Sequence, residues 1–202
     1  IGSLMTYGMN LILAAFGSAQ TVFGIYFKLQ SFVFMPVFGL NNGMVPIIAY
    51  NYGAGHKDRV IKTIKHSVAY GVGIMFAGLL VMHIFPAQLM RMFDAEESLI
   101  AIGAPALETI SLSFVFAGFC IVAGSVFQAL GNGVYSMIVS VARQMCVLLP
   151  VAKLLSLSGE VTLIWWAFPI AELASVLLTS YFLVRIYRKV ICHIGEPVVQ
   201  DA

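Results

Sequence analysis

The feature that most constrains this chain is a series of long apolar segments separated by short polar links. A helix needs about 20 mostly apolar residues to cross a bilayer. The segments lack the period-2 alternation of barrel strands, so we expect an all-α integral membrane protein, a bundle of six transmembrane helices. The predicted spans, the first of them short, lie at about residues 3–18, 20–48, 67–85, 100–128, 134–156 and 161–187.

Composition supports a lipid environment. Hydrophobic residues make up 60% of the chain and charged residues only 10%, against roughly 45–50% and 25% in soluble domains. We therefore expect the lipid bilayer to be a partner of the outer surface. The net charge of +2 is too small and too dispersed for a nucleic-acid surface. Three cysteines without CxxC spacing predict buried thiols, with no metal site and no cofactor.

Basic residues near the span ends predict the orientation, because Lys and Arg concentrate in short cytoplasmic loops. Two basic clusters are separated by four predicted spans, so one topology places both in the cytoplasm. The opposite loop, residues 86–99, is acidic. We expect a multi-pass protein with both termini in the cytoplasm and residues 191–202 as a cytoplasmic tail. The clusters are Lys57, Arg59, Lys62 and Lys65 in an expected loop over 51–66, and Arg185, Arg188 and Lys189 near the C-terminus.

The second predicted span contains residues that break or bend helices. Kinked backbone inside a membrane is tolerated only where it is buried in protein or lines a water-filled cavity, so we expect a hinge here. The two glycines also form a GxxxG pattern, which favours close packing of a neighbouring helix. For the two asparagine amides between these residues, two roles remain open: packing against a neighbouring helix, or lining a polar cavity. The expected hinge residues are Pro36, Gly39, Gly43 and Pro46, and the amides between them are Asn41 and Asn42.

Charged side chains inside the bilayer persist only where they are paired, face a cavity or reach the interface. Glu172 lies roughly 16 Å from the outer end of its span, and Arg143 roughly 13 Å from the inner end of the preceding one, at 1.5 Å per residue. The helices are antiparallel neighbours, so Arg143 can reach Glu172, with Gln144 beside it. Two interpretations remain open: a structural ion pair, or a carboxylate that exchanges a proton as the cavity changes.

Two further polar residues lie within the second span, Lys28 and Gln30. Lys28 is about eight residues, or roughly 12 Å, into the span. A Lys at that depth either extends to the interface or points into a central cleft. Both residues therefore belong to the predicted substrate or cation pathway, together with the amides and the ion pair.

Several segments resemble one transporter family in pattern and length. The run from Gly24 to Gly55, which includes Gly39-Leu40-Asn41-Asn42-Gly43, closely resembles the eighth helix and following loop of MATE (multidrug and toxic compound extrusion) transporters. The resemblance covers about residues 1–190. The other matching segments are residues 127–133, which look like the end of the tenth helix, 143–145, like the eleventh, and 168–172, like the twelfth.

This resemblance implies a fold and a function. MATE transporters have twelve helices in two six-helix lobes, and residues 1–190 resemble the C-terminal lobe, helices seven to twelve. The family exports amphiphilic, often cationic compounds across the plasma membrane, here the bacterial inner membrane, in exchange for H⁺ or Na⁺. The partners implied are the N-terminal lobe and small amphiphilic organic cations. The span at 3–18 has no acid and Glu108 lies near an outer helix end, which favours H⁺ over Na⁺.

Three alternatives accompany this interpretation. A flippase for lipid-linked oligosaccharides would need a more cationic cleft, for which Arg143 and Lys28 are the candidates. An intramembrane serine protease is disfavoured because the sequence has no GxSG-type serine, so we expect no enzyme. The chain starts Ile1-Gly2-Ser3, and we expect its true start to be missing. A truncated lobe without function is therefore the third alternative.

Overall fold

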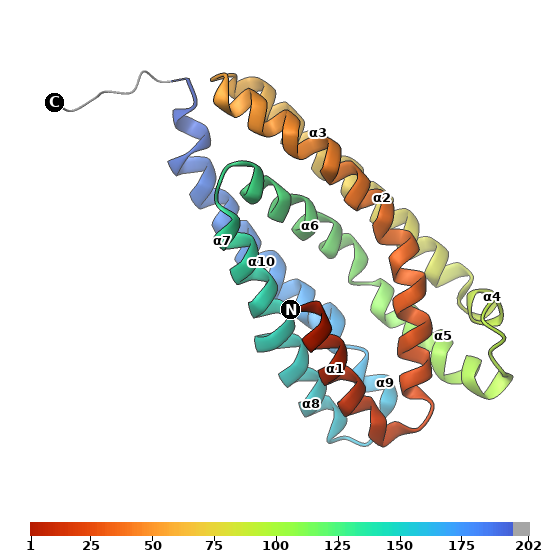
Figure 1. The fold of residues 1–202 in the computed structure, drawn as a ribbon. Helices are drawn as coiled ribbons and strands as arrows, with labels where there is room; N and C mark the ends of the chain where they lie inside the picture. Colours follow the sequence, from red (N-terminus) through yellow and green to blue (C-terminus); the bar gives the residue numbers. More distant parts are fainter. Residues whose placement is uncertain (196–202) are drawn as a thin grey trace.

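The computed structural model describes residues 1–195, and these residues form helices without any strand (Figure 1). The helices pack side by side as an elongated bundle, with α2 against α3 and α6, and α10 against α6. Their bounds are α1 Gly2–Leu13 with the 3₁₀ turn η1 Ala14–Phe16, α2 Ala19–Gly53, α3 Lys57–Ile84, α4 Pro86–Arg91, α5 Glu97–Ser111, α6 Phe114–Ala129, α7 Gly133–Val141, the π-helix η2 Ala142–Leu148, α8 Leu149–Ser156, α9 Val161–Ile164, α10 Ala167–Lys189 and the 3₁₀ turn η3 Ile191–His193.

The predicted all-α membrane architecture is confirmed. Within the described residues, four helical stretches are long and apolar enough to span a membrane: 19–53, 57–84, 133–156 and 161–193. The pair α5 and α6 adds a fifth span if it is counted as one, with a bend of 48°. The first predicted span, at about residues 3–18, corresponds to the apolar but shorter stretch Gly2–Phe16. All six predicted segments are therefore helical.

The expected loop over 51–66 was wrong in extent. Helix α2 continues to Gly53 and α3 already begins at Lys57, so the link is only residues 54–56. Gly55 allows this tight turn because its φ is +73°. Hydropathy detects the apolar part of a helix, whereas α2 and α3 also include polar residues next to the link. The basic cluster at 57–65 consequently lies on the first turns of α3.

Three of the predicted spans are not straight α-helices. The fourth is broken between α5 and α6, where the Ser113 hydroxyl donates to the carbonyl of Ile110 at 2.6 Å. Such a bond from a serine to its own helix competes with the backbone ladder and favours a bend. The sixth predicted span is broken at residues 165–166, between α9 and α10. The fifth contains the π-helix η2.

The expected bend in α2 is visible, but the helix does not unwind. Residues 19–53 form one continuous helix that includes Pro36 and Pro46, and its ribbon changes direction part-way along (Figure 1). Each proline lacks the N–H that would bond four residues back, which accounts for a bend without a break. The two prolines flank Asn41, which is buried.

The predicted close packing at the GxxxG motif was wrong within the described residues. A Cβ placed on Gly39 or Gly43 would meet no atom within 4 Å. The close approach lies instead between α3 and α6, where a Cβ on Gly118 would lie 3.0 Å from the carbonyl oxygen of Gly71. A small-residue pattern shows that a helix can be approached closely, but it does not say whether a neighbour is there.

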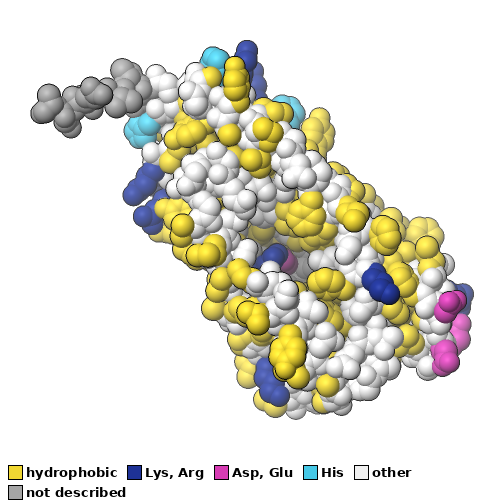
Figure 2. All heavy atoms as spheres, viewed as in Figure 1, with side chains coloured by type: hydrophobic (Ala, Val, Ile, Leu, Met, Phe, Trp, Pro, Cys, Tyr) yellow, Lys and Arg dark blue, Asp and Glu magenta, His cyan; other side chains and the backbone are white. Residues whose placement is uncertain are grey.

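The two ends of the bundle differ in charge. On the face in Figure 2, acidic side chains gather at the end formed by α4 and the start of α5, and histidines lie at the opposite end. That opposite end carries the start of α3 and the end of α10, so the two predicted basic clusters share one end (Figure 1). Residue 1 lies part-way along the bundle in the same view.

The start of the predicted tail packs against the bundle. Ile191 and Ile194 are buried, and the Lys57 ammonium donates to the Cys192 carbonyl at 2.8 Å. Residues 196–202, the rest of the predicted tail, lie outside the described part of the chain. The cysteine prediction holds only in part, because Cys120 is buried whereas Cys146 is exposed and Cys192 is partly exposed.

Candidate functional site

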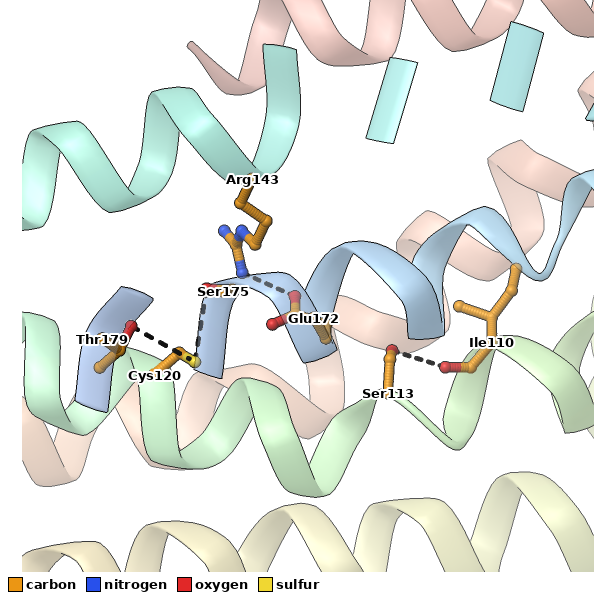
Figure 3. A network of polar contacts seen from close by, with 7 residues as sticks. All are labelled: Ile110, Ser113, Cys120, Arg143, Glu172, Ser175 and Thr179. Atoms are coloured by element: carbon orange, nitrogen blue, oxygen red, sulfur yellow. Dashed lines mark hydrogen bonds and ion pairs between the residues drawn. The ribbon is translucent and has the colours of Figure 1, made fainter. Parts of the chain in front are cut away.

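An ion pair lies at the centre of the candidate site. The Arg143 guanidinium donates from Nη1 to Oε1 of Glu172 at 2.7 Å (Figure 3). The side chains are 22% and 12% exposed, respectively, so neither is fully withdrawn from solvent. The contact expected from the helix positions is therefore present. A partly buried pair has a strong interaction in a medium of lower permittivity than water.

The π-helix η2 positions one member of this pair. Arg143 and Gln144 are its second and third residues, and Pro150 follows just after it. Pro150 has no N–H for the carbonyl of residue 146 and its ring crowds that carbonyl, which disfavours a regular α-helix here. A π-helical turn is uncommon and is frequently found at functional sites. The wider turn sets the direction in which the Arg143 side chain leaves the helix.

A cavity of about 680 Å³ lies between α1, α2, α6, α7, η2 and α10. A smaller neighbouring cavity of about 70 Å³ contacts Glu172. Gln30, Arg143 and Gln144 line both cavities, so the two cavities are adjacent. Figure 2 shows a hollow in this face of the molecule with basic and acidic atoms inside it. The volume lies within the range of about 300–1,000 Å³ typical of small-molecule sites.

The cavity wall combines aromatic and polar side chains. Asn41 and Asn42 line it from α2. Aromatic rings have a negative face that attracts organic cations. The aromatic lining residues are Phe27, Phe34, Phe38 and Phe127.

The unpaired polar atoms at these cavities are all hydrogen-bond acceptors. Among the described residues, five buried side-chain N or O atoms have no hydrogen-bond partner, and three of them belong to cavity-lining residues. These three are Asn41 Oδ1, Gln144 Oε1 and Glu172 Oε2. Buried acceptors without donors are costly and are rare in folded proteins. The site thus offers oxygen atoms to a group that brings donors.

The structure does not bring Lys28 to this cavity. Its side chain is exposed, and its ammonium lies 5.7 Å from the centre of the Phe93 ring, beyond the end of α4. Two residues along a helix correspond to about 200° of rotation, which places Lys28 on the face opposite Gln30. Of the predicted pathway residues, Gln30, Asn41, Asn42, Arg143, Gln144 and Glu172 line the two cavities.

Sequence reasoning missed a polar cluster beside the ion pair. The hydroxyls of Ser175 and Thr179 donate to the Cys120 sulfur at 3.4 and 3.7 Å (Figure 3). All three residues line the larger cavity. The signal was available, because residues 172, 175 and 179 follow the spacing of one helix face.

Comparison with known proteins decides the family. The family model named MatE matches residues 3–154, most of the described chain. The chain belongs to the MatE family. It is 27% identical over 183 residues to the multidrug export protein MepA of Staphylococcus haemolyticus, covering 90% of this chain and 40% of MepA. It is likewise 27% identical over 166 residues to MepA of Staphylococcus aureus, of which it covers 36%.

Solved structures of MATE transporters have the same fold. The MATE multidrug transporter DinF-BH, solved in complex with rhodamine 6G, is 33% identical, with a TM-score of 0.80 over 92% of this chain and 42% of that one. The Vibrio cholerae MATE transporter VcmN in its bent form has a TM-score of 0.87 at 18% identity, over 96% of this chain and 44% of VcmN. This MatE chain thus spans about 40% of the length of its relatives, which fits one lobe, and those relatives are transporters, not enzymes.

Proposed function

We propose that this MatE chain is the C-terminal lobe of an exporter of amphiphilic, cationic organic compounds. The observation that carries the proposal is the cavity with three unpaired oxygen acceptors and an aromatic wall. Organic cations bind to aromatic faces and donate to oxygen acceptors. The related DinF-BH was solved with rhodamine 6G and the related MepA proteins are named multidrug export proteins, which supports the same class of substrate here.

The proposed transport cycle needs a second lobe. The N-terminal lobe would close the open side of the cavity, and alternating access would arise from rocking of the two lobes around the bound compound. The bend in α2 supplies flexibility on the cavity wall, with the hinge at Pro36, Gly39, Gly43 and Pro46. The proposed setting is the bacterial plasma membrane, with the basic end of the bundle in the cytoplasm.

The proposed energy source is exchange for a cation, with H⁺ favoured. Glu172 is the acidic residue at the described cavities, and its Oε2 atom has no hydrogen-bond partner. Protonation there would weaken the ion pair and free Arg143 to move. This gives a physical route by which proton uptake changes the cavity, while a purely structural role for the pair predicts no such dependence.

Cavity charge favours a drug cation over a lipid-linked pyrophosphate. Arg143 is the one basic residue that lines the two cavities within the described chain, and it is already paired with Glu172. Lys28, the second cation considered for a flippase, is exposed on the outer face. A pyrophosphate would therefore meet no free positive charge in this cavity.

Efflux of a fluorescent cation tests the proposal. Cells expressing the intact polypeptide are loaded with ethidium, and the wild type is compared with Glu172→Gln. We expect efflux to fall at least fivefold at equal membrane levels, because Gln leaves Arg143 without its counter-ion. Glu108→Gln is the matched control, since Glu108 lines neither cavity. Normal efflux by Glu172→Gln would reject a role of the pair in transport.

A further inference from the structure

A second groove lies on the outside of the bundle, between α2 and α3. It has a volume of about 450 Å³ and shares no lining residue with the central cavity. Its floor is the GxxxG motif, since Gly39 and Gly43 line it and a Cβ on either would point into open space. The groove is therefore present because these positions lack side chains. Neither the packing of the described chain nor the transport cavity accounts for the motif.

The two walls of the groove differ in polarity. The α2 side contributes Leu40, Met44 and Ile47, whereas the α3 side contributes Lys62 and His66. Lys62 belongs to the basic cluster on the first turns of α3, which lies at the end of the bundle that carries both basic clusters. The groove lining contains no acidic residue. An occupant should accordingly have an apolar part and a negatively charged head.

A buried serine at the groove supports a ligand with acceptor atoms. Ser67 is only 5% exposed as a residue and lines the groove, and its hydroxyl makes no hydrogen bond among the described residues, although its oxygen is not one of the five fully buried unpaired atoms. Ser31 of α2 and Thr63 of α3 donate to the carbonyl four residues back, Thr63 to Arg59 at 2.8 Å. Ser67 does not, so its O–H is available as a donor.

We infer that this groove binds an anionic phospholipid of the cytoplasmic leaflet. The phosphate would lie at Lys62 and within reach of the Ser67 hydroxyl, and an acyl chain would lie along Gly39 and Gly43. Basic pockets between transmembrane helices on the cytoplasmic side are suited to anionic headgroups, and that leaflet is the one enriched in them. Lipid is favoured over free phosphate because the α2 wall of the groove is apolar. This lipid groove is separate from the central cavity proposed to hold the exported compound.

Native mass spectrometry of the purified intact polypeptide, titrated with phosphatidylglycerol or phosphatidylcholine, tests this inference. We expect retention of phosphatidylglycerol over phosphatidylcholine. Lys62→Gln should weaken phosphatidylglycerol binding about fivefold, the effect of about one cation near an anionic lipid. Gly43→Leu should weaken it at least tenfold, because the added side chain fills the groove without a clash. Ser67→Ala is a milder variant and should weaken binding severalfold.

Two controls separate the groove from general surface effects. Lys153→Gln removes a positive charge at the other end of the bundle, and Gly73→Leu adds the same side chain at an open position of α3 outside the groove. Both should bind phosphatidylglycerol like the wild type. Equal binding of the two lipids, equal loss in the controls, displacement by inorganic phosphate, or unchanged binding by Gly43→Leu would overturn the inference. If Gly43→Leu binds phosphatidylglycerol normally but is less stable than the wild type, the occupant of the groove is instead a transmembrane helix.

Discussion

The ion pair between Arg143 and Glu172 gives the most quantitative prediction. Two unit charges about 4 Å apart interact by about 4 kcal/mol at an effective permittivity of about 20. The Nη1–Oε1 distance is 2.7 Å, but the side chains retain 22% and 12% exposure. We therefore expect roughly half of that energy, a coupling of about 2 kcal/mol, which lies inside the range of about 0.5–3 kcal/mol for residues in contact.

A double-mutant cycle measures this coupling. The wild type, Arg143→Gln, Glu172→Gln and the double variant are unfolded by denaturant titration in the same micelles. Each single variant leaves one charge without its partner, so each should lose about 2–3 kcal/mol. The double variant should lose about 2 kcal/mol less than the sum of the two single losses, since two Gln residues leave no charge behind. Additive losses, with a coupling below about 0.5 kcal/mol, would refute the reasoning.

Three other variants test separate parts of the fold. Gly118→Val should lower the unfolding temperature by several degrees, because its Cβ would lie 2.8 Å from the Met75 side chain. Gly73→Val, at an open position, should change the unfolding temperature little. Equal effects of the two variants would contradict this packing. Lys57→Met should free the start of the tail and increase maleimide labelling of Cys192 severalfold; unchanged labelling would contradict a role of that bond. Pro150→Ala should restore a backbone donor, favour α over π geometry in η2, and weaken binding of rhodamine 6G severalfold; unchanged binding would show that the π-helix does not shape the cavity.

The helical architecture could be predicted because it depends on hydropathy alone. Each apolar segment had to span the membrane as a helix, since lipid offers no partner for backbone groups. The contact of Arg143 with Glu172 could also be predicted, because depth along two antiparallel helices follows from 1.5 Å per residue. The ends of the helices were harder to predict, as the early start of α3 at Lys57 shows. Helices continue into water wherever local propensity and caps allow it.

Which face a residue occupies was harder to predict than its depth. Lys28 has the depth of a pathway residue, but it lies on the outer side of α2, which only the packing of α2 against α3 and α6 determines. The GxxxG motif likewise predicts a helix face without side chains, but it does not predict which element packs against that face. The π-helix at Arg143 depends on the register of backbone bonds, which Pro150 biases but does not fix. These features depend on tertiary contacts that periodicity does not describe.

Binding of rhodamine 6G to the purified intact polypeptide most directly tests whether the cavity at the ion pair holds the exported compound. Fluorescence polarisation compares the wild type with Ser140→Trp, whose new ring would fill the cavity, and with Val141→Trp, one residue along and exposed outside it. We predict that Ser140→Trp weakens rhodamine 6G binding at least tenfold and that Val141→Trp binds like the wild type. Equal affinity of wild type and Ser140→Trp would contradict the proposed site.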